Sequence, residues 1–233
     1  MTIDINVHKN ILINILKDIF SNTQIAAHLG FKGGTAALLF YNLTRFSVDL
    51  DFDLLNGQNE DIVFDAVNAI LKNYGQVTSR KKRYSIFFLL SYEGKLPNDQ
   101  KIKIEINKRN FASRYEVKKY LGIAMQVMIQ EDMFAHKLVA MHERISKTNR
   151  DIFDVWFFFH NNWPLNTGIV ELRTNMIYRD FLQVCINDLE KMDNRGILSG
   201  IGELLNEKQK AWAKAKLISN TIFALNLALN NAR

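Results

Sequence analysis

Aspartates recur at every second position near residue 50. The segment SVDLDFDLL, residues 47–55, places Asp49, Asp51 and Asp53 between large apolar residues. In an extended strand alternate side chains share a face, so the carboxylates would point one way and the apolar residues into the core. Three carboxylates on one face repel each other, and proteins usually offset such a row with cations. Oxygen ligands at this spacing suit hard divalent ions such as Mg²⁺ or Ca²⁺, so the segment predicts a metal site on a strand.

A calcium-binding EF-hand loop is the rival interpretation of the same residues. D-x-D-x-D from Asp49, with Glu60 at the twelfth position, imitates that loop. The sixth position of an EF-hand must turn sharply through glycine, whereas Leu54 stands there. The alternation of large apolar residues is also typical of a strand, so the sequence favours the strand.

A second segment with strand alternation carries another carboxylate. In KIKIEIN, residues 101–107, the three isoleucines would face inward, and Glu105 would lie on the polar face together with the lysines. A lone glutamate in an amphipathic strand is ordinarily a solvent-facing residue, so its value comes from the aspartate row that it would adjoin. Glu105 is therefore the candidate third carboxylate of the metal site.

Paired glycines precede the aspartate row by one helix length. Gly33, Gly34 and Thr35 lie between an expected strand and an expected helix, where backbone N–H groups and the helix dipole bind anions. Neither the P-loop pattern nor the Rossmann fingerprint is present, and a glycine pair alone is more often a tight turn. Because phosphoryl and nucleotidyl transfer need phosphates and Mg²⁺ together, the glycines and the aspartates jointly predict that chemistry.

The elements that must position these residues follow from hydrophobic periodicity. We expect helices at residues 8–20, 35–42 and 60–75, and strands at residues 25–30, 47–55, 83–93 and 101–108. From about residue 115 the strand signals end, and helical spacing covers residues 129–146, 150–161, 168–192 and 198–230. The sequence therefore predicts an α+β protein, with a mixed α/β domain over residues 1–115 and an α-helical bundle domain over residues 116–233.

Composition limits the class of protein. A chain of 233 residues with 48% hydrophobic content can bury a sizeable core. The single cysteine, Cys185, cannot form an intramolecular disulfide, no signal peptide is evident, and the apolar runs are too short to span a membrane, so we expect a cytoplasmic protein. The net charge of +6 favours a polyanionic partner. For the basic cluster RKKR at residues 80–83, a solvated turn and a nucleic-acid contact remain open.

The order of these motifs resembles a known family. K-G-G-T at residues 32–35, followed by R-x-S-x-D-x-D at 45–51, resembles the polymerase-β-like nucleotidyltransferases and, among them, the AbiEii/AbiGii abortive-infection toxins. The segment EDMFAHKLVAMHERI (131–145) resembles that family's A-x-K-L helix, and RDIFDVWFF (150–158) its R-D-x-x-D segment. The resemblance implies a nucleotidyltransferase-type first domain and a helical bundle that completes the active-site cleft.

The resemblance also implies roles for individual residues. Asp49 and Asp51 would bind the divalent ions, Mg²⁺ or Mn²⁺, and Glu105 would complete the carboxylate set. The residues that would bind or brace the nucleoside triphosphate are Gly33, Gly34, Thr35, Arg45, Ser47 and Lys137. Asp53 lies beyond the family pattern, so its role is open between a supporting carboxylate and an edge residue.

Lys137 and the acids of the next helix also have interpretations from spacing. Met133, Lys137 and Met141 fall on one helical stripe, so a cation interrupts an apolar face. Extension of the ammonium group to solvent is the alternative to a triphosphate contact. Asp151 and Asp154 share a helix face, where acids in a first turn also interact favourably with the helix dipole. Of the two, we expect Asp151 to be catalytic.

The sequence thus predicts a Mg²⁺-dependent nucleotidyltransferase that moves NMP from an NTP to an acceptor hydroxyl by two-metal chemistry. In the resembled family the acceptor is thought to be the 3′ end of tRNA, and the enzyme is the toxin of a toxin–antitoxin or abortive-infection system with an antitoxin protein as its partner. Two alternatives remain. One is a non-catalytic NTP- or RNA-binding module, and the other is NMP transfer onto a protein side chain.

Overall fold

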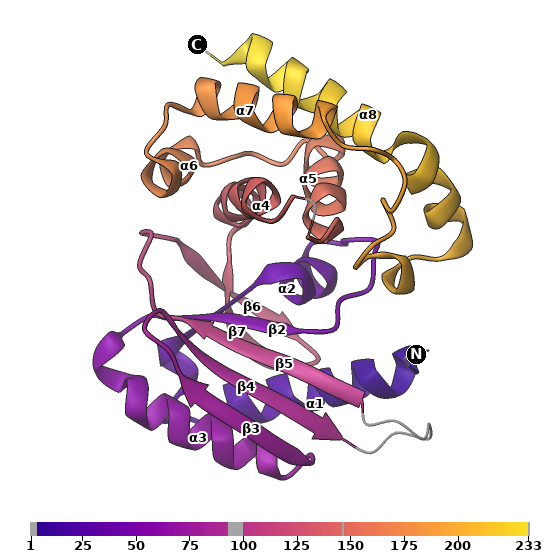
Figure 1. Cartoon of the computed structure of the whole chain (residues 1–233). Coiled ribbons are helices and arrows are strands. Elements are labelled where there is room, and N and C mark those ends of the chain that lie inside the picture. The colour runs from indigo at the N-terminus through magenta and orange to yellow at the C-terminus, as the bar shows by residue number, and fades with distance from the viewer. Residues whose placement is uncertain (1–3, 93–99, 146, 233) are drawn as a thin grey trace. The chain divides into compact units, whose positions relative to one another are not determined.

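The computed structural model describes residues 4–92, 100–145 and 147–232 (Figure 1). The chain forms two compact units. The first contains Met1–Asn110 and Arg114–Met128, and the second contains Phe111–Ser113 and Ile129–Arg233. No helix among the described residues combines the length and the apolar character needed to cross a bilayer.

A mixed sheet organises the first unit. Its described strands are β1 (Leu29–Lys32), β2 (Leu50–Leu54), β3 (Gln76–Lys81), β4 (Ser85–Tyr92), β5 (Gln100–Asn107), β6 (Tyr115–Tyr120) and β7 (Ile123–Met128). They lie in the order β3-β4-β5-β2-β1-β7-β6. The pairs β2–β5 and β1–β7 are parallel, and the other neighbours are antiparallel. The strand that carries the aspartates therefore lies in the interior of the sheet, directly beside the strand that carries Glu105.

Three helices cover the sheet. Helices α1 (Ile5–Ser21) and α3 (Glu60–Lys72) pack against each other on one face, and α2 (Gly33–Phe40) lies on the other face against β1 and β2 (Figure 1). Helix α1 begins because the Asp4 side chain accepts hydrogen bonds from the first free backbone N–H groups. Phe88 of β4 stacks on Phe64 of α3, and Phe31 and Phe52 pack 5.4 Å apart. The apolar residues of the sheet thus pack against α1 and α3. The polar residues of β2 and β5 lie on the opposite face.

The second unit is helical. Its helices are α4 (Gln130–Arg144), α5 (Arg150–His160), α6 (Thr167–Thr174), α7 (Tyr178–Glu190) and α8 (Glu207–Asn231). Helix α5 packs against α4 and α8, and α7 packs along α8. Phe134 of α4 meets Phe158 of α5, and Trp156 of α5 lies 4.0 Å from Trp212 of α8 between ring centroids. These rings form much of the core that holds α4 and α5 together.

Most expected elements are confirmed to within a few residues, but three of them differ more. The strand expected at 25–30 is wrong at its start, because Ala26–His28 forms a 3₁₀ turn and β1 begins at Leu29. The helix expected at 168–192 is interrupted at Asn175, which adopts a left-handed conformation (φ 55°) at the end of α6. Helix α8 begins only at Glu207, after a capping box between Asn206 and Gln209.

The expectation that strands end near residue 115 is wrong. Strands β6 and β7 extend the sheet of the first unit, and apart from Phe111–Ser113 the second unit begins at Ile129. Leu121 and Gly122 both have positive φ, which suits the two-residue turn of this hairpin. Strand β6 is an edge strand, and its charged residues blur the apolar alternation. The other edge strand, β3, has the same charged character and is not evident from the sequence.

Candidate active site

The predicted carboxylates come together on one face of the sheet. Asp51 in β2 pairs directly with Glu105 in β5, and paired residues of neighbouring strands share a face. Leu50 and Phe52 are fully buried on the opposite face. Asp49 precedes β2 by one residue. It lies beside the same lysine as Glu105, because Lys103 Nζ is 4.0 Å from Asp49 Oδ2.

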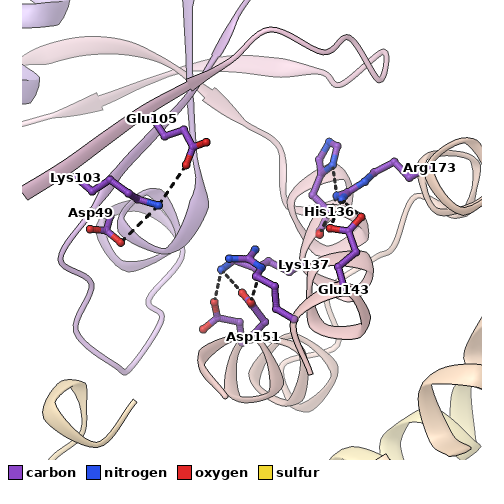
Figure 2. A network of polar contacts seen from close by, with 10 residues as sticks. Asp49, Lys103, Glu105, His136, Lys137, Glu143, Asp151 and Arg173 are labelled. Carbon is purple, nitrogen blue, oxygen red and sulfur yellow. Dashed lines mark hydrogen bonds and ion pairs between the residues drawn. The ribbon is translucent and has the colours of Figure 1, made fainter. Parts of the chain in front are cut away.

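Lys103 is the counter-cation of this carboxylate row. Its Nζ lies 3.3 Å from Glu105 Oε2 and points between Glu105 and Asp49 (Figure 2). Burial lowers the pKa of Lys103, but the charges of Asp51, Asp49 and Glu105 outweigh burial and raise it above its usual value. Burial conversely raises the pKa of Glu105, and Lys103 outweighs it, with further help from Ser85 and Lys82, so that this pKa is lowered. The sequence placed Lys103 on this face without indicating that it would neutralise the row.

The row fits a divalent metal by the chemistry of its donors. Asp49, Asp51 and Glu105 offer carboxylate oxygens, which are the ligands that Mg²⁺ and Mn²⁺ prefer. Within the described ranges, no three acidic, histidine or cysteine side chains meet in a metal-binding arrangement. The approach of the Lys103 ammonium group shows that the carboxylate row attracts positive charge.

Neighbouring residues of the candidate site leave no room for a side chain at either of the paired glycines. Gly33 begins α2 with φ +80°, and a Cβ there would lie 2.5 Å from Asp51 Oδ2. A Cβ at Gly34 would lie 2.8 Å from Ser47 Oγ and 2.9 Å from Arg45 Nη2. A side chain at either position would therefore collide with another residue of the candidate site. The prediction that paired glycines open the helix is confirmed.

Buried polar side chains brace the segment that leads to Asp49. The Thr35 hydroxyl donates to the carbonyl oxygen of Asp49 and lies 2.9 Å from Ser47 Oγ. Arg45 donates from Nη1 to the carbonyl oxygen of Phe46 at 2.8 Å. Thr35, Ser47 and Arg45 are all buried. These contacts fix the loop between α2 and β2, so they set the position of Asp49.

Asp53 holds strands together. Its Oδ1 accepts from Lys32 Nζ at 2.5 Å and from Asn107 Nδ2 at 2.7 Å, and its Oδ2 accepts from the Tyr115 hydroxyl at 2.5 Å. The partners come from β1, β5 and β6. Asp53 is buried, and β2 is an interior strand, so it is not an edge residue. Its oxygens are engaged in connecting four strands.

In the helical unit, Lys137 is held by two buried acids. Its Nζ lies 2.8 Å from Asp151 Oδ1 and 2.8 Å from Asp154 Oδ2, so the ammonium group does not extend into solvent (Figure 2). Burial raises the pKa of Asp151, but Lys137 and Arg144 outweigh burial and lower it. An ammonium group carries three hydrogens, so two carboxylates leave one donor of Lys137 for a further anion.

A second polar network was missed from the sequence. Arg173 donates to His136 Nδ1 at 3.1 Å and to both carboxylate oxygens of Glu143 (Figure 2). Because arginine can only donate, Nδ1 must accept, so Nε2 of the neutral ring carries the hydrogen and donates to Ser113 Oγ at 2.7 Å. The network fastens residues 111–113 to α4. No motif indicates it, because its members lie far apart in the sequence.

Comparisons with solved structures agree with this architecture. A candidate nucleotidyltransferase from H. pylori aligns over 100% of this chain and 97% of its own, with 20% identity and a TM-score of 0.66. JHP933 from Helicobacter pylori aligns over 99% and 97%, with 19% identity and a TM-score of 0.57. MenT4, a nucleotidyltransferase toxin from Mycobacterium tuberculosis, aligns over 95% and 84%, with 19% identity and a TM-score of 0.60. These likenesses confirm the predicted nucleotidyltransferase fold.

The family itself is identified by sequence. No curated protein matches the chain. A family model described as the nucleotidyl transferase AbiEii toxin of a type IV toxin–antitoxin system matches residues 14–215. Because this match spans most of the 233 residues, the chain belongs to the AbiEii family of nucleotidyltransferase toxins from type IV toxin–antitoxin systems.

Proposed function

We propose that the protein transfers NMP from an NTP to the hydroxyl at the 3′ end of tRNA, using Mg²⁺ or Mn²⁺, and that a partner antitoxin controls this activity. The observation that carries the proposal is the meeting of Asp51 and Glu105 on one face, directly beside Gly33. This combination puts carboxylates and an anion-binding helix terminus together, which is what nucleotidyl transfer requires.

Asp49, Asp51 and Glu105 would hold the divalent ions. When bound, these ions would favour ionisation of the acceptor hydroxyl and stabilise the charge on the leaving pyrophosphate. The acceptor oxygen forms a bond to the α-phosphorus, the bond between the α-phosphorus and the bridging oxygen breaks, pyrophosphate leaves, and the hydroxyl proton passes to water. The lowered pKa of Glu105 keeps its carboxylate ionised at neutral pH, as a metal ligand must be.

The first turn of α2 would bind the triphosphate. The backbone N–H groups of Gly33, Gly34 and Thr35 begin this helix, and the side chain of its N-cap residue, Lys32, makes no capping hydrogen bond. Backbone N–H groups at the positive end of a helix attract phosphate. Arg45 and Ser47 would maintain the shape of this turn through the contacts that leave no room for a side chain at Gly34.

Lys137 would contribute a further contact to the triphosphate through its remaining hydrogen. Asp151 and Asp154 would then act as positioning residues that fix the Lys137 ammonium group. The lowered pKa of Asp151 supports this role, because an acid that stays ionised is suited to holding a cation.

Two other functions use the same residues. A non-catalytic NTP- or RNA-binding module is favoured by the ion pair between Lys103 and Glu105, which gives the carboxylates a structural partner. Transfer of NMP onto a protein side chain would use the same site with another acceptor. The net charge of +6 is compatible with an RNA acceptor, because a basic protein attracts the phosphate backbone.

The test is incubation of the purified protein with Mg²⁺, total tRNA and each α-labelled NTP in turn. An Asp49→Ala, Asp51→Ala double variant is the inactive comparison, and Asp65→Ala, an exposed acid of α3, is the matched control. Label on tRNA from the parent protein and the control, but not from the double variant, is the expected result. Label on protein alone would identify a protein acceptor. Absence of any label, with NTP binding intact, would favour the binding module.

A further inference from the structure

The polar face of the sheet continues beyond the carboxylates to the edge of the molecule's first unit. Asp51 pairs with Glu105, Glu105 pairs with Phe87 of β4, and Phe87 pairs with Arg80 of β3. Residues paired across neighbouring strands lie on the same face, and adjacent strands are about 4.8 Å apart. Phe87 is therefore one strand away from Glu105, and Arg80 is two strands away.

Cations lie over the aromatic ring nearest to the carboxylates. Arg80 Cζ is 4.9 Å and Lys82 Nζ is 4.8 Å from the centre of the Phe87 ring. Phe87 itself pairs directly with Glu105 across β4 and β5. Positive charge thus lies directly beside the predicted metal ligands.

A second aromatic ring repeats the arrangement in the turn between β3 and β4. Tyr84 is 51% exposed, and Arg83 Cζ lies 4.9 Å from its ring centre. Arg109, which follows β5, lies 5.9 Å from the same ring. We call this surface the aromatic–basic face, and its residues are Arg80, Lys82, Arg83, Tyr84, Phe87 and Arg109.

The cations of this face differ from their neighbour Lys81. Lys81 points to the other side of the sheet, where it pairs with Asp61 and lies over Phe64 of α3. Arg80, Lys82 and Arg83 have no ion pair with a carboxylate among the residues that the structure describes, and all three are exposed. Each of them lies over an aromatic ring, so their charge is available to an anion from solvent.

We propose that the aromatic–basic face binds the single-stranded 3′ end of the acceptor RNA and directs its terminal hydroxyl to the carboxylate row. This inference rests on the proposed function. Single-stranded nucleic acid is bound by cations that contact phosphates and by rings that stack on bases, and this face alternates both kinds of side chain. Its continuity with Asp51 and Glu105 fits an acceptor that reacts at its end.

Binding can be measured without NTP or metal, so the test does not depend on catalysis. A fluorescent, unstructured RNA oligonucleotide is titrated with protein at several salt concentrations. We expect an Arg80→Gln, Lys82→Gln, Arg83→Gln triple variant to bind at least about tenfold more weakly and to reduce the slope of log K against log salt by about 2, since each phosphate contact on a single strand contributes about 0.7. Tyr84→Ala should weaken binding and leave the slope unchanged, because stacking releases no counterions.

The control is a second triple variant that removes the same number of positive charges from another surface, helix α8. Lys208→Gln, Lys214→Gln, Lys216→Gln removes three exposed lysines of α8 and should leave affinity and slope unchanged. Equal losses from both triple variants would overturn the proposal, because they would reveal unspecific attraction. Tighter binding of a blunt RNA duplex than of the single strand would also overturn it.

A second measurement separates this inference from the proposed function. In NMP transfer to tRNA, the triple variant in the aromatic–basic face should raise KM for tRNA and leave kcat nearly unchanged. Unchanged KM in an active enzyme would overturn the inference while the proposed function stands. A parent protein that binds single-stranded RNA through this face but transfers no NMP would overturn the proposed function and support the surface as an RNA-binding site.

Discussion

Asp51 and Glu105 are direct partners in the parallel pair of β2 and β5, although a helix and two other strands separate them in the sequence. Their meeting depends on register, because a slip of one residue would turn Glu105 to the apolar face. The isoleucines of β5 oppose that slip, since Ile104 and Ile106 are fully buried. The apolar core therefore positions the carboxylates.

Replacement of Asp51 by asparagine should remove activity without unfolding the protein. The loss of a metal ligand should lower kcat/KM for tRNA labelling by about a thousandfold, which corresponds to about 4 kcal/mol. The free energy of unfolding should change by less than about 1 kcal/mol, because the change also relieves repulsion within the row. Asp65→Asn is the matched control. Retained activity in Asp51→Asn would contradict a role in metal binding.

Replacement of Gly33 by alanine should destabilise the protein. A left-handed conformation costs an L-residue about 1–2 kcal/mol, and the new Cβ would press on Asp51 in addition. Gly57 is the matched control, because a Cβ there meets nothing within 4 Å. Urea denaturation should show a lower free energy of unfolding for Gly33→Ala and almost no change for Gly57→Ala. Equal effects at the two positions would contradict this account.

Replacement of Lys103 by methionine should raise the pKa of Glu105. Lys103 is the main group that lowers this pKa below the usual value of 4.5, and Lys101, an exposed lysine of the same strand, is the control. A titration of the glutamate side-chain carbons by NMR measures the shift directly. An unchanged Glu105 pKa in Lys103→Met would exclude the ion pair.

The same variant should alter how stability depends on pH. A carboxyl group with a lowered folded-state pKa stabilises the fold above its unfolded-state pKa, near 4.5, and this contribution is lost as pH falls through the folded-state value. Lys103→Met should therefore be less stable than the parent at pH 7, and the difference should shrink below about pH 4.5. Urea denaturation at several pH values measures it, and a difference that grows toward acid pH would contradict the sign.

Replacement of Lys137 by methionine should leave Asp151 and Asp154 buried without their cation. Breaking a buried ion pair from one side costs about 3–5 kcal/mol. Adding Asp151→Asn and Asp154→Asn should recover part of that loss, whereas Lys208→Met should have no effect.

The thiol of Cys185 offers a measurement of this stability. Because burial raises the pKa of Cys185 to about 12, its thiol is unreactive in the folded helical unit. Thiol labelling in urea therefore follows unfolding of this unit, and no loss of stability in Lys137→Met would contradict the geometry.

The sequence could predict which face the carboxylates occupy, because strand alternation is a local signal. The period of two places Asp49, Asp51 and Glu105 on polar faces without any knowledge of which strands pair. It did not reveal that Lys103 would neutralise them, since this depends on the pairing of β2 with β5. Asp53 shows the same limit. It follows the same alternating pattern as Asp49 and Asp51, but its hydrogen bonds to three other strands depend on how the sheet is assembled.

Edge strands and long-range networks were the parts that the sequence did not reveal. In β6, Lys118 and Lys119 follow each other and interrupt the apolar alternation, because an edge strand needs fewer buried positions and benefits from charge. Arg173 and His136 meet through helix packing rather than spacing, so no periodicity predicts their contact.

Because β1 lies between β2 and β7, a truncated form of the first unit must include β7. A fragment that ends at residue 115 would lack β7 and leave one side of β1, in which Leu29, Gly30 and Phe31 are buried, with unpaired backbone groups. Such an edge is a template for aggregation. During synthesis β1 lacks its partner β7 until residue 128 has left the ribosome. The carboxylates of β2 and β5 are therefore synthesised before the sheet that supports them can be completed.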